Sequence, residues 1–383
     1  MLPLGEQIEI TSTMLGETRP IYIYVPQGLW GMDEDMTNLP VIYVLDAESQ
    51  FDHTATTVDF LSIATNGNDF IPRSIVVGIP NTADRTKDLT PVEDTRFETS
   101  GGGGNFLEFI AQELIPFIDA HYSTSAHRTI IGHSFGGLIA FEALLRKREL
   151  FDNYIAVDPG FGIAGGAYLS EVIDTLSHCD LRAENIFCGI ANNRPMFLTQ
   201  DQMMADTSEF IKSFGQPNQR LVDAHQISDW LVNLTIEYYD DENHYSIPHR
   251  STYDGLRALY DFYTFPEMTG YYHPAYKDRT DLVERLKDHY QKASARLGYE
   301  VVPMQGYLNS FAYGLSHFDR EDLAIDLLEY NIELHPDNPV VYNNLGYFYM
   351  THGYRSQALG VYRKSIELKM DEEILQTIQN LQE

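Results

Sequence analysis

Eight short segments of the chain have the hydrophobic pattern of β-strands. The first two alternate apolar and polar residues, as strands with one solvated face do. The third, residues 40–46, is apolar on both faces, as a strand inside a mostly parallel sheet must be. The predicted strands are residues 8–13, 21–25, 40–46, 74–79, 129–131, 154–157, 186–190 and 234–238.

Helical periodicity separates most of these strands. In residues 105–122 the apolar side chains recur every three or four positions and form one stripe. Strands that alternate with helices predict an α/β fold with an open, doubly wound, mostly parallel sheet covered by helices on both faces. The other predicted helices of this region are residues 56–65, 169–176, 208–214 and 253–262.

From about residue 276 the pattern changes to continuous helix. A single apolar stripe covers residues 280–297, and beyond it similar residues recur 34 positions apart, as Ala324 and Ala358 do. Small residues at matching positions let paired helices pack closely, which is typical of tetratricopeptide repeats. We therefore expect two domains, an α/β domain over residues 1–275 and an all-α domain over residues 276–383 with repeats at 305–338 and 339–372.

Two repeats are fewer than an independent helical solenoid usually needs. The C-terminal helices are therefore expected to pack on the first domain as an intramolecular lid, or to build a homodimer.

The charge of the chain limits its partners. With 26 basic and 56 acidic residues the formal net charge is −30, which repels phosphate backbones and anionic lipids. We therefore expect no nucleic-acid or membrane partner. The chain shows no signal-peptide pattern and no run of 18 apolar residues, and Cys179 and Cys188 fit neither a disulfide framework nor a metal site. The expectation is a cytoplasmic protein with buried, reduced thiols and no metal.

The most informative segment is Gly132-His133-Ser134-Phe135-Gly136, which follows a short β-branched run. Leu138, Phe141 and Leu144 then recur at helical spacing, so the segment reads as strand, tight turn and helix. A serine on such a turn projects from the carboxyl edge of the sheet, with a helix N-terminus behind it. Ser134 is therefore the predicted nucleophile.

A serine hydroxyl needs a base within hydrogen-bond reach, and the base needs an orienting acceptor. In this fold the base follows the last strand, which favours His244 over His249, because Pro248 and Arg250 place His249 at the entrance of the next helix. His133 alternates away from the nucleophile and is expected to make a packing or loop contact.

The orienting acid is less clearly marked. Ala191-Asn192-Asn193 has amides where a carboxylate would be expected after the seventh strand. Asp201, Asp206 and Asp158 are the candidates, and Asp206 is preferred. Backbone N–H groups of Phe135 and Glu48 are expected to bind the oxyanion.

Two further segments are possible contributors to the site. The polar stretch 81–91 follows a central strand at its carboxyl end, where ligands bind in such sheets. Four glycines, residues 101–104, precede a helix, but no Lys-Ser or Lys-Thr pair follows them. We expect a flexible loop or a helix lead-in there, not a phosphate site.

Several stretches in combination resemble the esterase D branch of the α/β-hydrolases, over roughly residues 1–265. They are PVIYVLDAESQF, VVGIPNTADRTKDLTP, TSGGGGNFLEFIAQELIPFI, GHSFGGL, AVDPG and ENHYSIPHRSTYDGLRALYDFY. That branch contains short-chain carboxylesterases, S-formylglutathione hydrolases and hydrolases that open trilactone siderophores. Some of its members carry a tetratricopeptide-like C-terminal extension.

The resemblance implies Ser134 as nucleophile and His244 as base. It favours Asp206 as acid, because the acid of related mycolyltransferases lies where the helix after the seventh strand begins. Some siderophore hydrolases of this branch work with a Ser-His pair alone. The chain departs from the family at Ala47, where glycine is common, and at residues 160–162, where Gly-Phe-Gly replaces an aromatic-rich segment.

These observations predict a serine carboxylic ester hydrolase for small, short-chain esters, with an acyl-enzyme intermediate and no cofactor. The alternatives are a siderophore, lactone or thioester hydrolase, and a repeat-mediated scaffold with a weakly active hydrolase domain. Anionic siderophores would need a local basic pocket, for which Arg85, Lys87 and Arg250 are the candidates.

Overall fold

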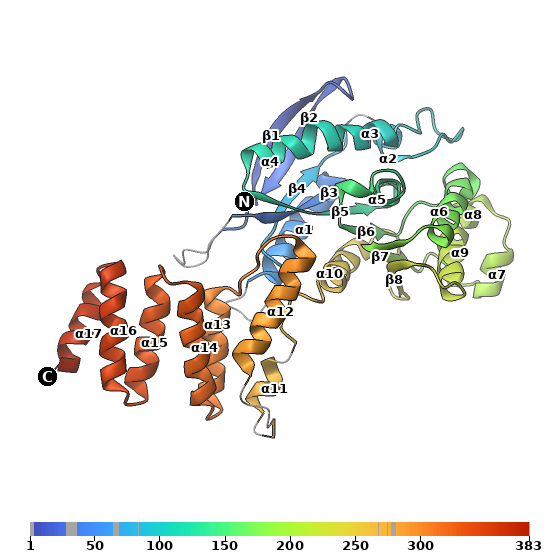
Figure 1. Ribbon diagram of the computed structural model, residues 1–383. Helices are drawn as coiled ribbons and strands as arrows, with labels where there is room; N and C mark the ends of the chain where they lie inside the picture. Colours follow the sequence, from blue (N-terminus) through green and yellow to red (C-terminus); the bar gives the residue numbers. More distant parts are fainter. Residues whose placement is uncertain are drawn as a thin grey trace. The chain divides into compact units, whose positions relative to one another are not determined.

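The computed structural model describes residues 4–27, 37–63, 69–82, 84–266, 268–273, 275–276 and 281–382. In this part of the chain eight strands form one sheet in the order β1-β2-β4-β3-β5-β6-β7-β8 (Figure 1). The pairs β1/β2 and β2/β4 are antiparallel, and every pair from β4 to β8 is parallel. The predicted open, mostly parallel sheet is confirmed.

The strands lie close to the predicted segments. They are β1 Glu6–Ser12, β2 Glu17–Tyr24, β3 Leu39–Leu45, β4 Ile75–Ile79, β5 Thr124–His133, β6 Asn153–Val157, β7 Leu181–Ala191 and β8 Val232–Tyr239. Every residue of β3, β4 and β6 is buried, which explains why these segments are apolar on both faces.

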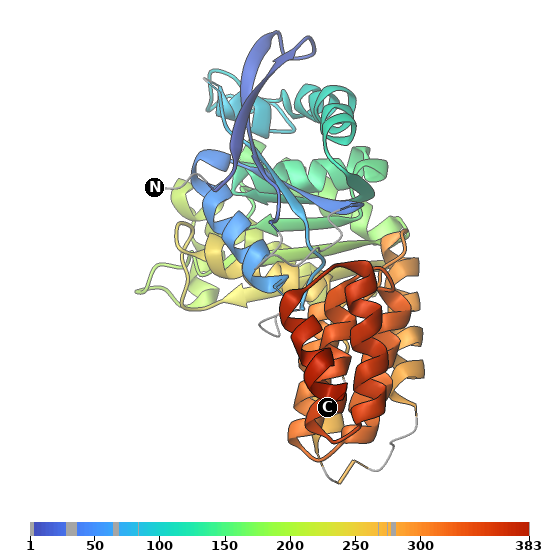
Figure 2. The ribbon, with the colours of Figure 1, turned by 90° about the vertical axis from the view of Figure 1, so that its left-hand side faces the viewer.

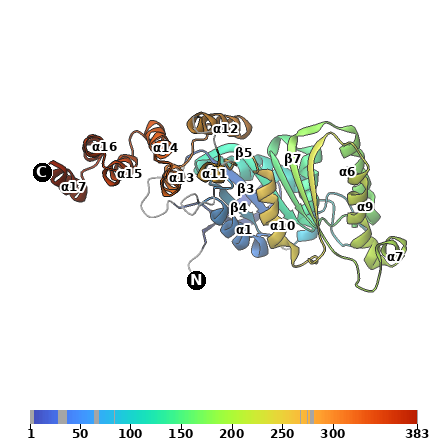
Figure 3. The same ribbon diagram turned by 90° about the horizontal axis from the view of Figure 1, so that it is seen from below.

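Helices cover both faces of the sheet. On one face α5 packs on β5 and β6, and α3 and α6 pack beside it. On the other face α1 packs on β3 and β4, α10 packs on β6 and β7, and the two helices lie side by side (Figure 3). The helices of this unit are α1 Ala47–Leu61, α2 Arg85–Leu89, α3 Gly103–Phe109, α4 Ile115–His121, α5 Phe135–Arg146, α6 Ala167–His178, α7 Gln200–Ala205, α8 Glu209–Ser213, α9 Gly215–Gln226 and α10 Ile247–Leu259.

Several helices differ from the prediction: α2, α7 and α9 were not predicted, and α10 begins at Ile247 instead of residue 253. Two other differences have a local reason. The helix predicted at residues 56–65 begins at Ala47, because Asp46 has a φ of 53° and turns the chain sharply after β3; residue 65 lies outside the described residues. The helix predicted at residues 105–122 contains a π-helical turn, Ile110–Leu114, between α3 and α4. Pro116 lies just after it and has no N–H to donate to an ordinary helical hydrogen bond.

Among the described residues, the second compact unit contains Ile63, Asp69 and those from Phe262 onward. The domain boundary predicted at residue 275 therefore lies later in the chain than the division observed at Asp261 and Phe262. Its helices, coloured orange to red in Figure 2, are α11 Met268–Tyr272, α12 Leu282–Leu297, α13 Gln305–His317, α14 Glu321–Leu334, α15 Pro339–Thr351, α16 Arg355–Leu368 and α17 Glu372–Gln382. The start of the helix predicted at residue 280 lies outside the described residues.

The 34-residue period reappears in the helices of this unit. α13 and α15 begin at residues 305 and 339, and α14 and α16 begin at residues 321 and 355, so both pairs of starts are 34 residues apart. At Gly346 an added Cβ would collide with the ring of Tyr362, so α15 and α16 approach closely where the small residue lies.

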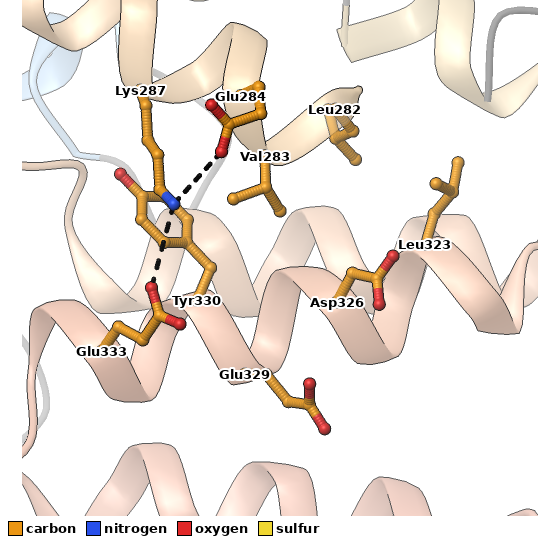
Figure 4. A pocket seen from close by; sticks show the side chains of 9 residues that line it. All are labelled: Leu282, Val283, Glu284, Lys287, Leu323, Asp326, Glu329, Tyr330 and Glu333. Atoms are coloured by element: carbon orange, nitrogen blue, oxygen red, sulfur yellow. Dashed lines mark hydrogen bonds and ion pairs between the residues drawn. The ribbon is translucent and has the colours of Figure 1, made fainter. Parts of the chain in front are cut away.

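A cavity of about 210 Å³ opens between α12 and α14 (Figure 4). Lys287 lies over the ring of Tyr330 and forms ion pairs with Glu284 and Glu333, at 3.3 and 4.0 Å. The described lining contains no serine, cysteine or histidine, and its polar side chains are four carboxylates, Lys287 and Tyr330.

Candidate active site

Ser134 occupies a strained turn between β5 and α5. Its φ and ψ are 59° and −117°, a conformation that a residue with a Cβ rarely adopts. The Ser134 N–H donates to Val157 O at 2.9 Å, and its carbonyl accepts from the N–H of Gly160 at 3.0 Å. A Cβ at Gly132 would collide with the carbonyl of Gly136. The glycine on the strand side therefore allows the turn, as the motif predicts.

Three adjacent strand ends carry this kind of strain. Asp46 after β3, Ser134 after β5 and Asp158 after β6 all have positive φ angles, of 53°, 59° and 40°. Such residues cost about 1–3 kcal/mol each and cluster at functional sites. The carboxyl edge of β3, β5 and β6 is therefore where the fold concentrates backbone strain.

His244 pairs with a buried carboxylate. Its Nδ1 lies 2.6 Å from Oδ2 of Asp158, and the side chains are 15% and 1% exposed. Asp158 also accepts from the N–H of Ala191 at 3.1 Å and from the amide groups of Asn193 and Asn218, both at 2.8 Å. A carboxylate with these donors is held in one orientation.

The carboxylate beside His244 is therefore Asp158, and the preference for Asp206 is corrected. Asp206 ends α7, and its Oδ1 accepts from the N–H of Ser208 at 2.7 Å, so it serves the start of α8. Asp201 is exposed on α7. The reason is the strand order: β6 lies directly beside β5, so Asp158 follows the strand next to the one that ends at Ser134.

The two asparagines beside Asp158 were not assigned roles from the sequence. The sequence shows asparagines, instead of a carboxylate, after β7. One of them, Asn193, donates to the carboxylate of Asp158, which follows the neighbouring strand β6. Asn218 lies on α9, 60 residues from Asp158, and no local pattern marks it.

The loop that carries His244 is anchored to two strand ends. His133, which precedes Ser134, has its Nε2 2.8 Å from the carbonyl of His244, and the two rings lie 4.6 Å apart. The backbone N–H of Asn192 donates to the carbonyl of Glu242 at 2.9 Å, and the side-chain amide of Asn192 donates to the backbone carbonyl of Asp240. Burial, and then the nearby His244, lower the pKa of His133 to about 4.

His133 thereby links His244 to the chain at Ser134. A neutral ring donates from Nε2 to the carbonyl, and the predicted loop contact of His133 is of this kind. Among the residues that the structure describes, no hydrogen bond joins Ser134 Oγ to His244 itself. Catalytic hydrogen bonds of this kind are often long without substrate and tighten when it binds.

A second polar cluster follows β3 and lies beside the elbow. The guanidinium of Arg85 contacts both carboxylate oxygens of Asp46, at 2.5 and 2.9 Å, and Asn81 Nδ2 donates to Asp46 at 2.6 Å. Asn81 also donates from its backbone N–H to Glu48 at 3.1 Å. The predicted loop 81–91 thus contributes Asn81 and Arg85 to the surroundings of Asp46, whose carboxylate also lies beside Gly136 of the elbow.

Both predicted oxyanion amides lie at helix N-termini. Phe135 is the first residue of α5, and Glu48 is the second residue of α1. First-turn N–H groups have no acceptor within their own helix and are suited to bind developing negative charge.

Other predicted residues have structural contacts. His249 lies on α10 and packs against His53 with the rings tilted and their centroids 4.2 Å apart. The N–H groups of Gly102 and Gly103 donate to the carbonyls of Lys87 and Thr90, so the glycine run packs on α2. Cys188 is buried, as expected, whereas Cys179 is only half-buried.

A serine at a strained strand–helix turn, with a buried carboxylate after the neighbouring strand and a histidine after the last strand, is the arrangement of the α/β-hydrolase class. The family model described as Esterase matches residues 12–164, which include Asp46, Ser134 and Asp158. No helix in the described ranges combines the length and the apolar character that crossing a membrane requires.

Two curated proteins are similar to part of this chain. The ferri-bacillibactin esterase BesA of Bacillus subtilis is 34% identical over 172 residues, and the match covers 40% of this chain and 58% of that protein. The siderophore triacetylfusarinine C esterase of Aspergillus fumigatus is 33% identical over 169 residues, covering 41% and 56%. The chain thus spans a little over half the length of these curated relatives.

Among solved structures, an IroE-like serine hydrolase from Shewanella oneidensis is 30% identical, with a TM-score of 0.66. The match covers 84% of this chain and 98% of that structure. The chain belongs to the esterase family of α/β-hydrolases.

Proposed function

We propose that the chain hydrolyses small carboxylic esters through an acyl-enzyme intermediate on Ser134. The observation that carries the proposal is the 2.6 Å contact between His244 Nδ1 and Asp158, at the sheet edge that also holds the strained Ser134. Family membership supports ester hydrolysis, and the site supports the serine mechanism.

In the first step His244 Nε2 removes the Ser134 hydroxyl proton while Oγ bonds to the ester carbonyl carbon. Asp158 accepts a hydrogen bond from Nδ1–H, so it keeps Nε2 free as the base and stabilises the ring once it is charged. The N–H groups of Phe135 and Glu48 bind the oxyanion.

The C–O bond to the alcohol then breaks, and His244 returns its proton to the leaving oxygen. Water, activated by His244 in the same way, attacks the acyl carbon, releases the acid and restores the Ser134 hydroxyl.

The test compares Ser134→Ala with Ser170→Ala, a matched substitution on the exposed face of α6. Ser134→Ala should lower hydrolysis of p-nitrophenyl acetate and butyrate by at least about 10³-fold, and Ser170→Ala should leave it unchanged. A fluorophosphonate should add to Ser134, as located by peptide mass spectrometry. Retained hydrolysis in Ser134→Ala would contradict the proposal.

Siderophore lactones are a second candidate substrate class, because two of the curated relatives are siderophore esterases by name. Two of the three cations considered for an anionic ligand are already paired. Arg85 binds Asp46, and Arg250 lies 2.7 Å from Asp241. Comparing turnover of a triscatecholate lactone with that of a simple butyrate ester separates the two classes.

A further inference from the structure

Large aromatic side chains surround His244 and remain exposed. The ring of Phe214 meets the His244 ring edge-on, with centroids 6.0 Å apart, although Phe214 is 42% exposed. The ring centroids of Phe210 and Phe214 are 5.6 Å apart, and those of Tyr245 and His244 are 5.4 Å apart. Tyr245 is 88% exposed. Exposed rings gathered at one place mark a binding surface more often than scattered ones do.

A second pair of rings lies on the nucleophile side. Phe135, which follows Ser134, meets Phe97 edge-on at 5.6 Å. Arg96, next to Phe97, donates to Ser213 Oγ at 2.9 Å. Because Ser213 precedes Phe214, this contact ties the segment that carries Phe97 to α8, which holds Phe210 and is followed directly by Phe214. The two groups therefore flank one site.

The proposed chemistry decides which part of an ester meets these rings. His244 returns its proton to the alcohol oxygen, so the alcohol group must lie beside the His244 ring. We propose that Phe210, Phe214 and Tyr245 bind the alcohol portion of the ester and select an aromatic, uncharged group there. This inference rests on the proposed function of Ser134 and His244.

The charges of the same loop favour an uncharged alcohol. Asp240 and Asp241 are exposed just before His244. Arg250 approaches this loop, but it is shared among Asp241, Glu242 and Asp254, at 2.7, 3.9 and 3.9 Å. An anionic alcohol group beside His244 would meet the carboxylates of this loop, where Arg250 is already shared among three of them.

Three acetate esters test the inference in the full-length protein. Benzyl and ethyl acetate have the same acyl group and similar leaving-group acidity, so their kcat/KM ratio reports binding of the alcohol. We expect benzyl acetate to exceed ethyl acetate by about tenfold, and to exceed 4-carboxybenzyl acetate by a similar factor.

The Phe214→Ala variant should lower kcat/KM for benzyl acetate by about tenfold, mainly through KM, and change ethyl acetate by less than about twofold. Phe214→Leu should retain part of the preference, because it keeps an apolar contact. The control is Ile227→Ala: Ile227 is also exposed, but it precedes β8 and so lies toward the amino edge of the sheet.

Equal losses on both esters in Phe214→Ala would show that Phe214 acts only on His244, and would overturn the inference. So would wild-type protein without a preference for benzyl acetate. Binding of benzyl alcohol, followed by ligand-observed NMR in the Ser134→Ala protein, does not depend on turnover. Loss of this binding in Ser134→Ala/Phe214→Ala supports the aromatic site even if the esterase proposal fails, and unchanged binding overturns it.

Discussion

At the scale of single residues, the contacts of Asp158 explain why its carboxylate can serve His244. It accepts from one backbone amide, two asparagine amides and the imidazole, and it is almost fully buried. Buried carboxylates of this kind depend on every donor, because an unmatched lone pair in the interior is costly.

Replacing this carboxylate should remove most of the activity. Asp158→Asn keeps the shape but places an amide where His244 Nδ1 needs an acceptor, so kcat should fall by about 10²- to 10⁴-fold. Asp206→Asn is the matched control and should change kcat by less than about twofold, because Asp206 contacts Ser208 instead. The measurement is kcat with p-nitrophenyl acetate. A large loss in Asp206→Asn with little in Asp158→Asn would contradict the assignment.

At the scale of elements, the strand–turn–helix unit of β5 and α5 depends on close backbone approach. The strain at Ser134 is tolerated because its N–H and carbonyl are bonded to Val157 and Gly160, on the neighbouring strand and the loop that follows it. The elbow is therefore stabilised by β6 as well as by its own glycines.

Gly132→Ala should destabilise this unit, because the new Cβ would meet the Gly136 carbonyl and the backbone would have to move. We expect a loss of about 2–4 kcal/mol in the free energy of unfolding, with loss of esterase activity. Gly104→Ala is the control: its Cβ would meet nothing within 4 Å, in helix α3, and the change should be neutral or stabilising by about 1 kcal/mol. Urea unfolding midpoints measure both, and equal midpoints for the two variants would refute the steric explanation.

At the scale of the whole molecule, the excess of carboxylates makes stability depend on pH, and one buried group should stand out. Asp69 is 2% exposed in the helical unit and accepts from the Tyr290 hydroxyl at 3.2 Å. Burial raises its pKa from 3.8 to about 7. The folded state therefore keeps a proton that the unfolded chain releases above about pH 4.

The contribution of Asp69 to stability is thus full below about pH 4 and is lost as pH rises to about 7. Its size is at most about 4 kcal/mol. Asp69→Asn cannot ionise, so its stability relative to wild type should increase between pH 4 and pH 8. Urea midpoints of both proteins at four pH values measure this difference. A difference that does not vary with pH would show that Asp69 titrates normally.

The predicted roles of the C-terminal helices as a lid or a dimer interface stay predictions. The 34-residue period of these helices is a property of the sequence, and the first residues of α13 and α15 show the same spacing.

The sequence by itself determined those features that depend on residues close together along the chain. Alternation, helical periodicity and glycine at residue 132 predict the strands, most of the helices and the elbow, because each depends on side chains a few positions apart. His244 could also be proposed, because the fold places the base after the last strand.

The partner of His244 was decided only by the tertiary structure. Asp158, Asn193 and Asn218 are far apart in sequence and meet because β6, β7 and α9 bring them to one strand edge. The aromatic rings around His244 come together in the same way. No pattern along the chain encodes these distances, since they follow from the order in which strands pair and helices pack.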